Sequence, residues 1–186
     1  MRMARCVLSY LNGSKELPLV LGGSSEVSAV TYSDASLGTG PKGRSVIGNT
    51  TKLNDRAGAV SANSKATQVV FTSSFEAELD GTTRGLKSNS RIVNVLVELG
   101  IQMSSLPHLW SDNKAMVNFI HGEGVAKGVR HMELRMWYVR ERYKQGNVVI
   151  DWMLGDAMPA DKLTKLGSRE DHEVFTRDIM GLGLLE

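Results

Sequence analysis

Residues 26–34 read EVSAVTYSD. In an extended chain this order places Val27, Ala29 and Thr31 on one face and their neighbours on the other, which predicts a β-strand. The strand ends at Asp34, an acid that follows apolar residues where a solvated charge is not needed. This stretch therefore predicts a strand together with a candidate functional carboxylate at its end.

The next part of the chain predicts two more strands of the same sheet. Residues 37–43 include three glycines and a proline, which is typical of a turn. Strands are expected at 45–53 and 58–64, with a turn at 54–55 between them. Because consecutive strands joined by short turns pair antiparallel, we expect an antiparallel meander here.

A long helix follows this meander. Ser73 or Ser74 can cap its start, and its apolar face runs to about Leu99, although Gly81 and Gly85 weaken its first half. The remaining elements are expected as a strand at 107–110, helices at 113–121 and 131–144, a strand at 148–152, and helices at 159–165 and 169–180. This order predicts an α/β fold, with a mixed sheet of five strands flanked by helices.

The N-terminal segment has a different pattern. Apolar residues at helical spacing between 4 and 11 predict a short helix, and residues 17–22 a brief strand. The glycines and serines of 22–25 are typical of a linker. We therefore expect an N-terminal extension at 1–23 and the main domain at 24–186.

The composition excludes several classes of protein. A length of 186 residues fits one domain, and 22 Lys+Arg against 20 Asp+Glu neither require nor exclude a polyanionic partner. Cys6 is the one cysteine, which excludes an intrachain disulfide and a cysteine-based zinc site. No apolar run approaches the roughly 18–20 residues of a membrane span, and the start lacks a signal-peptide stretch. We expect an intracellular protein with no membrane partner, whose core includes Trp110, Trp137 and Trp152.

Four acids lie where strands end and helices begin. Asp34 ends the first strand, Glu78 lies in the first turns of the long helix, Asp112 joins a strand to a helix, and Asp161 opens a helix. Carboxylates that converge repel each other unless a cation compensates, and Mg²⁺ prefers oxygen ligands of this kind. Two such ions about 4 Å apart can activate a water and stabilise the leaving oxygen of a phosphodiester. The alternative is that Asp112 and Asp161 are helix N-caps and that Asp34 is a turn residue.

Several short blocks around these acids resemble one family. The blocks are Tyr32-Ser33-Asp34-Ala35, Gly58-Ala59-Val60-Ser61 with Ser64-Lys65, Ser73-Ser74-Phe75-Glu76-Ala77-Glu78, Ser111-Asp112-Asn113-Lys114-Ala115, Arg130-His131-Met132-Glu133-Leu134-Arg135 with Val139-Arg140-Glu141, and Ala160-Asp161-Lys162-Leu163-Thr164-Lys165. In this order they resemble the ribonuclease H domain of copia-type LTR retrotransposon polyproteins. Upstream, residues 7–15 resemble the tail of the reverse transcriptase connection segment. The resemblance spans nearly the whole chain.

This resemblance implies a fold, an activity and partners. The fold would be ribonuclease H-like, with three antiparallel strands and then parallel additions. The activity would be cleavage of the RNA strand of RNA–DNA hybrids during reverse transcription, next to the reverse transcriptase domain of the same polyprotein. Two Mg²⁺ ions, with Mn²⁺ as a substitute, would be held by Asp34, Glu78, Asp112 and Asp161. The location would be cytoplasmic, within virus-like particles.

The glutamate of this set has a rival. Glu76 and Glu78 point about 200° apart on a helix, so only one can face the metals. We choose Glu78, because Glu-Leu followed by a helix resembles the ligand position of cellular ribonucleases H. The chain departs from the family where Asp80-Gly81 follows, since an apolar helical stretch is usual there.

Recognition of the RNA strand would use its 2′-hydroxyls, the groups that mark it directly. We expect those contacts from small polar residues near the metals: Ser33, Ser36, Ser74 and Asn113.

Phosphate contacts are expected from a local excess of basic residues, namely Lys127, Arg130, Arg135, Arg140, Arg142 and Lys144. An equally good interpretation is a solvated helix face, in which Glu133 and Glu141 balance these charges.

Two other functions remain open. One is a catalytically weak or inactive hybrid-binding or structural module derived from the same kind of element. The other is an integrase-like or resolvase-like nuclease that acts on DNA, against which the Ser73–Glu78 block and the connection-like segment argue.

Overall fold

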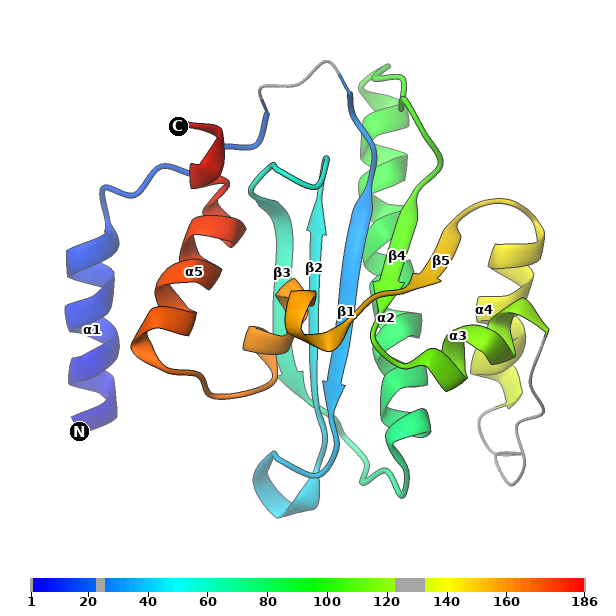
Figure 1. Ribbon diagram of the computed structural model, residues 1–186, viewed down its shortest axis with the longest axis horizontal. Coiled ribbons are helices and arrows are strands. Elements are labelled where there is room, and N and C mark those ends of the chain that lie inside the picture. The colour runs from blue at the N-terminus through cyan, green and yellow to red at the C-terminus, as the bar shows by residue number, and fades with distance from the viewer. Residues whose placement is uncertain (1, 23–25, 123–132, 186) are drawn as a thin grey trace.

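A five-stranded sheet with the order β3-β2-β1-β4-β5 forms the centre of the molecule (Figure 1). The computed structural model describes residues 2–22, 26–122 and 133–185. The strands are β1 (Val30–Ser36), β2 (Val46–Lys52), β3 (Ala59–Ala66), β4 (His108–Ser111) and β5 (Val149–Trp152). The helices are α1 (Arg2–Ser14), α2 (Ser74–Glu98), α3 (Lys114–His121), α4 (Glu133–Lys144) and α5 (Arg169–Met180), with short 3-10 helices at Pro41–Gly43 (η1), Gly155–Ala157 (η3), Pro159–Leu163 (η4) and Leu182–Leu184 (η5).

The pairing of the strands confirms the predicted mixed sheet. β1, β2 and β3 pair antiparallel, whereas β4 pairs parallel with β1 and β5 parallel with β4. In this register Asp34 lies opposite Gly48 of β2, and Ser33 lies opposite Ser111 of β4. The carboxyl ends of β1 and β4 are therefore adjacent, which sets the positions of Asp34 and Asp112.

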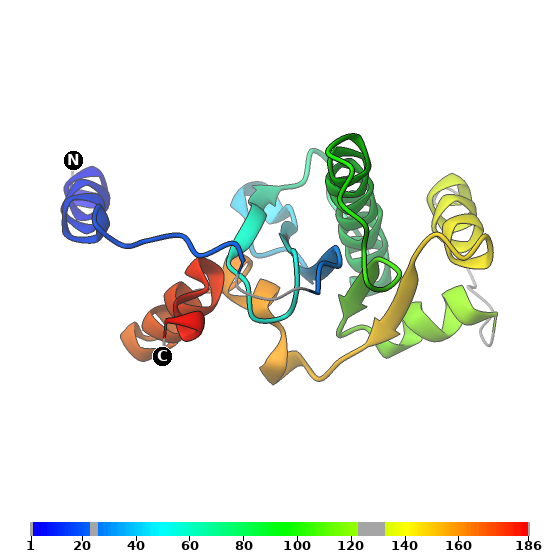
Figure 2. The same cartoon turned by 90° about the horizontal axis from the view of Figure 1, so that it is seen from above.

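Helix α2 packs across β1, β2 and β4 on one face of the sheet (Figure 2). Its glycines explain how close it lies. A Cβ atom on Gly85 would be 2.9 Å from the Asn49 Oδ1 atom, and one on Gly81 would be 3.1 Å from the Ser33 Oγ atom. The two glycines lower helix propensity, but they allow the backbone of α2 to lie directly against the side chains of the strands.

The segment that carries η4 packs on β1 and β2 as well (orange in Figures 1 and 2). Here Gly48 makes the approach possible, because a Cβ atom on it would lie 2.7 Å from the Leu163 Cβ atom and 2.8 Å from the Ala160 carbonyl oxygen. Gly48 is the strand partner of Asp34, so this contact brings residues 160–164 next to the acid.

Helix α5 is fastened to the sheet by an ion pair. The Lys52 ammonium lies 2.6 Å from Asp178 Oδ1, and its side chain is 1% exposed. Helix α1 lies beside α5, where Tyr10 and His172 meet edge to face with ring centroids 5.2 Å apart (Figure 1). Most of α1 is exposed, including Leu8 at 65%. No described helix combines the length and the apolar character needed to cross a bilayer.

Two predictions about the fold are wrong. Residues 17–22 form no strand, because Val20 bonds two different partners, the carbonyl of Met180 and the N–H of Gly58, and does not join a ladder. Trp137 and Trp152 do not fill the core, since they are 62% and 41% exposed. The expected boundary between residues 23 and 24 lies outside the described residues.

Candidate functional site

Three carboxylates from distant parts of the chain meet at one place. Asp34 of β1, Glu78 of α2 and Asp112, which follows β4, each offer a ligand oxygen, and these oxygens all lie within 4.8 Å of one another. The parallel register of β1 and β4 places the two aspartates side by side. We call these three residues the carboxylate cluster.

The start of helix α2 fixes the third member of the cluster. The Ser73 hydroxyl accepts a hydrogen bond from the Glu76 N–H and caps the helix. The Glu76 carboxylate turns back and accepts a hydrogen bond from the Thr72 N–H at 2.9 Å. Glu78, one turn into the helix, is the glutamate that faces Asp34 and Asp112. The structure thus brings the chosen glutamate to the cluster and gives Glu76 another partner.

The turn after η4 holds Asp34 in place. The Thr164 hydroxyl donates a hydrogen bond to Asp34 Oδ2. The Lys165 ammonium donates to Asp161 Oδ1 and lies 3.9 Å from Asp34 Oδ1. Asp161, the fourth predicted ligand, therefore stands next to the cluster across Lys165, and it is not one of the three acids whose oxygens meet.

Sequence reasoning missed both Thr164 and Lys165. Both belong to the block around Asp161, and Lys165 lies one helical turn after that acid, which is the spacing of a helical ion pair. That spacing was the available signal for the pair of Lys165 with Asp161.

Trp152 is a second residue that the sequence did not connect with the site. Its indole N–H donates a hydrogen bond of 2.9 Å to the Asp112 carbonyl oxygen. The ring therefore supports the backbone that carries Asp112 while one side of it stays exposed.

Burial dominates the electrostatics of the cluster. Burial, then the facing charges of Asp112 and Asp34, raises the pKa of Glu78 to about 9. Burial also raises the pKa of Asp34 and of Asp112 above their ordinary range, against the lowering effects of Thr164 and Lys165 on Asp34. Without a divalent metal ion the cluster therefore favours a bound proton, even beside Lys165.

One further observation fits a cation site. Glu78 Oε2 is buried and has no hydrogen-bond partner among the described residues. Three hard oxygen donors within ligand distance, one of them buried and unsatisfied, suit a divalent ion such as Mg²⁺ or Mn²⁺.

The four residues predicted to contact the RNA strand differ in how exposed they are. Ser33 is 0% exposed and lies under Gly81 of α2, so in this structure its hydroxyl offers no surface for the predicted contact. Ser36 is 7% exposed and offers little surface. Ser74 is exposed, and Asn113 is half-buried, with its side chain accepting the Met116 N–H as the N-cap of α3. Of the four, Ser74 and Asn113 lie where a strand could touch them.

The structure describes only some of the residues predicted to bind phosphate. Lys127 and Arg130 fall outside the described residues. Arg135 lies 3.4 Å from Asp80 Oδ1, and Arg84 lies 2.8 Å from Asp80 Oδ2. Asp80, the departure from the family pattern, is thus the anchor of an ion cluster that joins α2 to α4.

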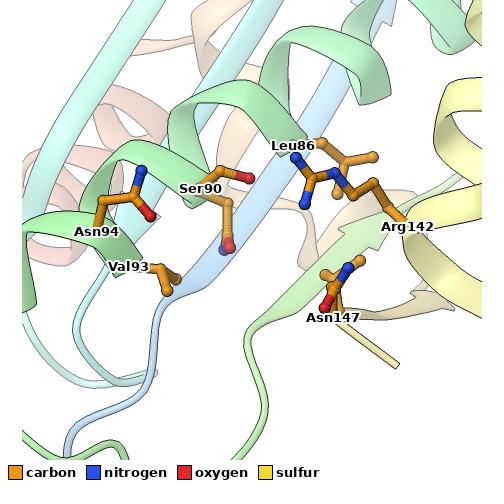
Figure 3. Close-up of a pocket in the computed structure, with 8 residues that line it drawn as sticks. Leu86, Ser90, Val93, Asn94, Arg142 and Asn147 are labelled. Atoms are coloured by element: carbon orange, nitrogen blue, oxygen red, sulfur yellow. The ribbon is translucent and has the colours of Figure 1, made fainter. Parts of the chain in front are cut away.

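A hollow of about 260 Å³ lies between α2 and the end of α4, lined by Leu86, Ser90, Val93, Asn94, Arg142 and Asn147 among others (Figure 3). Leu86 is about two turns, or about 12 Å, beyond Glu78 along the helix, and the other α2 residues are farther away. Arg142 is the one charged side chain among the described residues that line it. This hollow is separate from the carboxylate cluster.

Solved structures with the same arrangement of strands and helices exist. The N-terminal RNase H domain of a Mycobacterium tuberculosis protein matches 82% of this chain and 98% of its own with a TM-score of 0.54 at 17% identity. An RNase H1 isolated from compost matches 73% of this chain and 91% of its own with a TM-score of 0.57, also at 17% identity. This chain has the ribonuclease H fold.

Comparison of amino-acid sequences finds a relative of the kind that the sequence blocks predicted, a retrotransposon polyprotein. The chain is 28% identical over 174 residues to the retrovirus-related Pol polyprotein from transposon RE2 of Arabidopsis thaliana. That match covers 93% of the chain and 12% of the polyprotein, so the chain spans about an eighth of that relative. No protein-family model matches. The resemblance to a retrotransposon polyprotein is confirmed by this relative, and the ribonuclease H fold by the solved structures.

Proposed function

We propose that this chain is a metal-dependent ribonuclease H that hydrolyses the RNA strand of RNA–DNA hybrids during reverse transcription of a retrotransposon. The observation that carries the proposal is the carboxylate cluster, in which two buried acids and the half-buried Asp112 have raised pKa values on a ribonuclease H fold. The second compost RNase H1 structure, with a TM-score of 0.55 at 14% identity, contains an RNA/DNA hybrid, which supports this substrate class.

Asp34, Glu78 and Asp112 would hold the metal, with Asp161 completing the set once Lys165 releases it. Bound Mg²⁺ would supply a water of lowered pKa and would stabilise the charge of the leaving oxygen. The chain's own part is to fix the ligands. Thr164 sets the orientation of Asp34, and Trp152 sets the backbone of Asp112.

The remaining parts of the proposal concern the surroundings. Ser74 and Asn113 would contact the RNA strand near the cluster, and Lys127 and Arg130 would bind phosphates. The reverse transcriptase domain of the same polyprotein would be the covalent neighbour, and the site of action would be virus-like particles.

The proposal is tested by incubating the purified chain with an RNA–DNA hybrid labelled on each strand in turn, with Mg²⁺. We expect cleavage of the RNA strand, loss of cleavage in EDTA, and at least about a hundredfold loss in Asp112→Asn. Arg169→Ala, which removes an exposed ion pair of α5, serves as the control for handling and purity.

Each other outcome points to a different function. Hybrid binding without cleavage would demote the chain to a binding module. Cleavage of double-stranded DNA in preference to the hybrid would favour the integrase-like or resolvase-like alternative. Equal cleavage by Asp112→Asn would assign the activity to a contaminant.

A further inference from the structure

One ammonium group stands among the four acids. The Lys165 Nζ atom bonds Asp161 Oδ1 and lies 3.9 Å from Asp34 Oδ1. Its charge also acts on Asp112 and on Glu78. The acids therefore already have a cation of their own, supplied by the chain.

The position of this cation is built by the fold. The Lys165 N–H donates to the Asp161 carbonyl at 3.0 Å, and the neighbouring Thr164 hydroxyl is bonded to Asp34. The same turn rests on Gly48, where there is no room for a Cβ atom. The backbone of Lys165 is thus fixed beside the cluster, while its side chain, 48% exposed, lies at the solvent side and has room to swing away.

The neighbouring lysine shows that this position is particular to Lys165. Lys162 sits on the same turn, but its Nζ atom lies 3.0 Å from Asp171 Oδ1, and 3.9 Å from Asp161 Oδ2. Lys162 pairs mainly with α5, whereas Lys165 faces the cluster.

We propose that Lys165 is a tethered counter-ion that competes with the divalent metal for Asp34 and Asp161. The inference rests on the proposed metal site and adds a residue that lowers the affinity of this site for the metal. While no metal is bound, the ammonium offsets the repulsion between the two aspartates. A divalent ion at the cluster and the ammonium repel each other, so the lysine has to leave Asp34 as the ion is held. Metal affinity is therefore set lower than the carboxylates alone would give.

The experiment is a calorimetric titration of the full chain with MnCl₂. We expect Lys165→Met and Lys165→Gln to bind Mn²⁺ about tenfold more tightly than the parent chain. Lys165→Arg keeps the charge and should stay within about threefold. Lys162→Met, the matched control, removes one positive charge from the same turn and should stay within about twofold.

Unchanged or weaker Mn²⁺ binding in Lys165→Met and Lys165→Gln would overturn the inference and leave the metal site standing. If neither the parent nor these variants bind Mn²⁺, the proposed metal site fails, and the competition with it. An increase in Lys162→Met equal to that in Lys165→Met would show a general charge effect and would also overturn it.

Thermal unfolding gives a readout that does not depend on activity. In EDTA, Lys165→Gln should unfold at a lower temperature than the parent, because Asp34 and Asp161 lose their cation. Saturating Mn²⁺ should remove most of that difference. Equal melting temperatures of the two proteins in EDTA would contradict the role of counter-ion.

Discussion

Glu78 is an acid whose pKa the fold moves from 4.5 to about 9. In the folded, metal-free chain it keeps a proton that the unfolded chain releases above pH 4.5. Since the folded state then binds more protons, stability falls as the pH rises between these two values. Melting temperatures in EDTA should therefore fall from about pH 5.5 to about pH 8.5.

Glu78→Gln removes this titration. We expect a shallower fall with pH and a higher melting temperature than the parent at the alkaline end, together with loss of Mn²⁺ binding. Glu76→Gln, two residues away and bonded to Thr72, is the control that should keep Mn²⁺ binding. Parallel profiles for the parent and Glu78→Gln would contradict the burial argument.

Lys52 and Asp178 form an unequal pair, with side chains 1% and 38% exposed. Asp178→Ala leaves a buried ammonium without its partner and should cost about 3 kcal/mol of unfolding free energy. Lys52→Met leaves an acid that water can reach and should cost less, about 1 kcal/mol. Urea unfolding at neutral pH measures both.

The control for this pair is Glu173→Ala on the same helix. Its ion pair with Arg169 is exposed, with side chains 60% and 87% accessible, so the change should be below about 0.5 kcal/mol. Equal losses for Lys52→Met and Asp178→Ala would show that the burial of Lys52 does not decide the stability of the pair.

At the scale of elements, α2 and η4 flank the site and lie close to the sheet. In each contact a glycine, Gly85 or Gly48, leaves room for the close approach. Gly85 of α2 faces Asn49 and Leu109, and Gly48 of β2 faces η4. Gly48→Ala forces a Cβ atom against the Leu163 Cβ atom and the Ala160 carbonyl, and overpacking of this kind costs about 1–3 kcal/mol. Because η4 leads into Thr164 and Lys165, we also expect Mn²⁺ binding to change.

The matched control for Gly48→Ala is Gly13→Ala in helix α1, where a Cβ atom would meet nothing within 4 Å. There the substitution should be neutral or slightly stabilising, because alanine favours the helix. A Gly48→Ala protein as stable as the parent would show that η4 can move without cost.

The sequence predicted the elements better than their contacts. Periodicity and caps located α2 closely, including the cap at Ser73, whereas β1 begins four residues later than expected and continues past Asp34 to Ser36. The same reasoning treated Gly81 and Gly85 as weak points of the helix, because their role depends on strands far away in the chain. The strand expected at 17–22 failed for a related reason, since its partners are the end of α5 and the residue before β3.

Over the whole molecule, α1 is attached to α5 and lies away from the sheet (Figure 2). A chain that lacks residues 1–17 keeps the Val20 hydrogen bonds and every residue of the cluster. We expect its unfolding free energy to change by less than about 1 kcal/mol, with unchanged Mn²⁺ affinity.

Removal of residues 169–186 is the contrasting truncation. It takes away Asp178 and leaves Lys52 buried without its partner, so this chain should be strongly destabilised in circular dichroism melts. If the chain that lacks residues 1–17 also fails to fold, the proposed division of the chain near residue 23 is wrong.

The site itself was predictable as a set of acids but not as a set of distances. Block order indicated Asp34, Glu78, Asp112 and Asp161, and the structure brings the first three together. The contact between Lys165 and Asp34 could not be predicted from the sequence, because the spacing of the acids does not show that a lysine lies between two of them.

The hydrogen bond from Thr164 to Asp34 joins residues that are 130 positions apart. During synthesis, Asp34 leaves the ribosome long before the residue that orients it. A nascent chain that stops short of residue 164 can pair its first strands, yet it has no means of setting this acid for metal. The carboxylate cluster would therefore reach its final arrangement only after residue 164 has been synthesised.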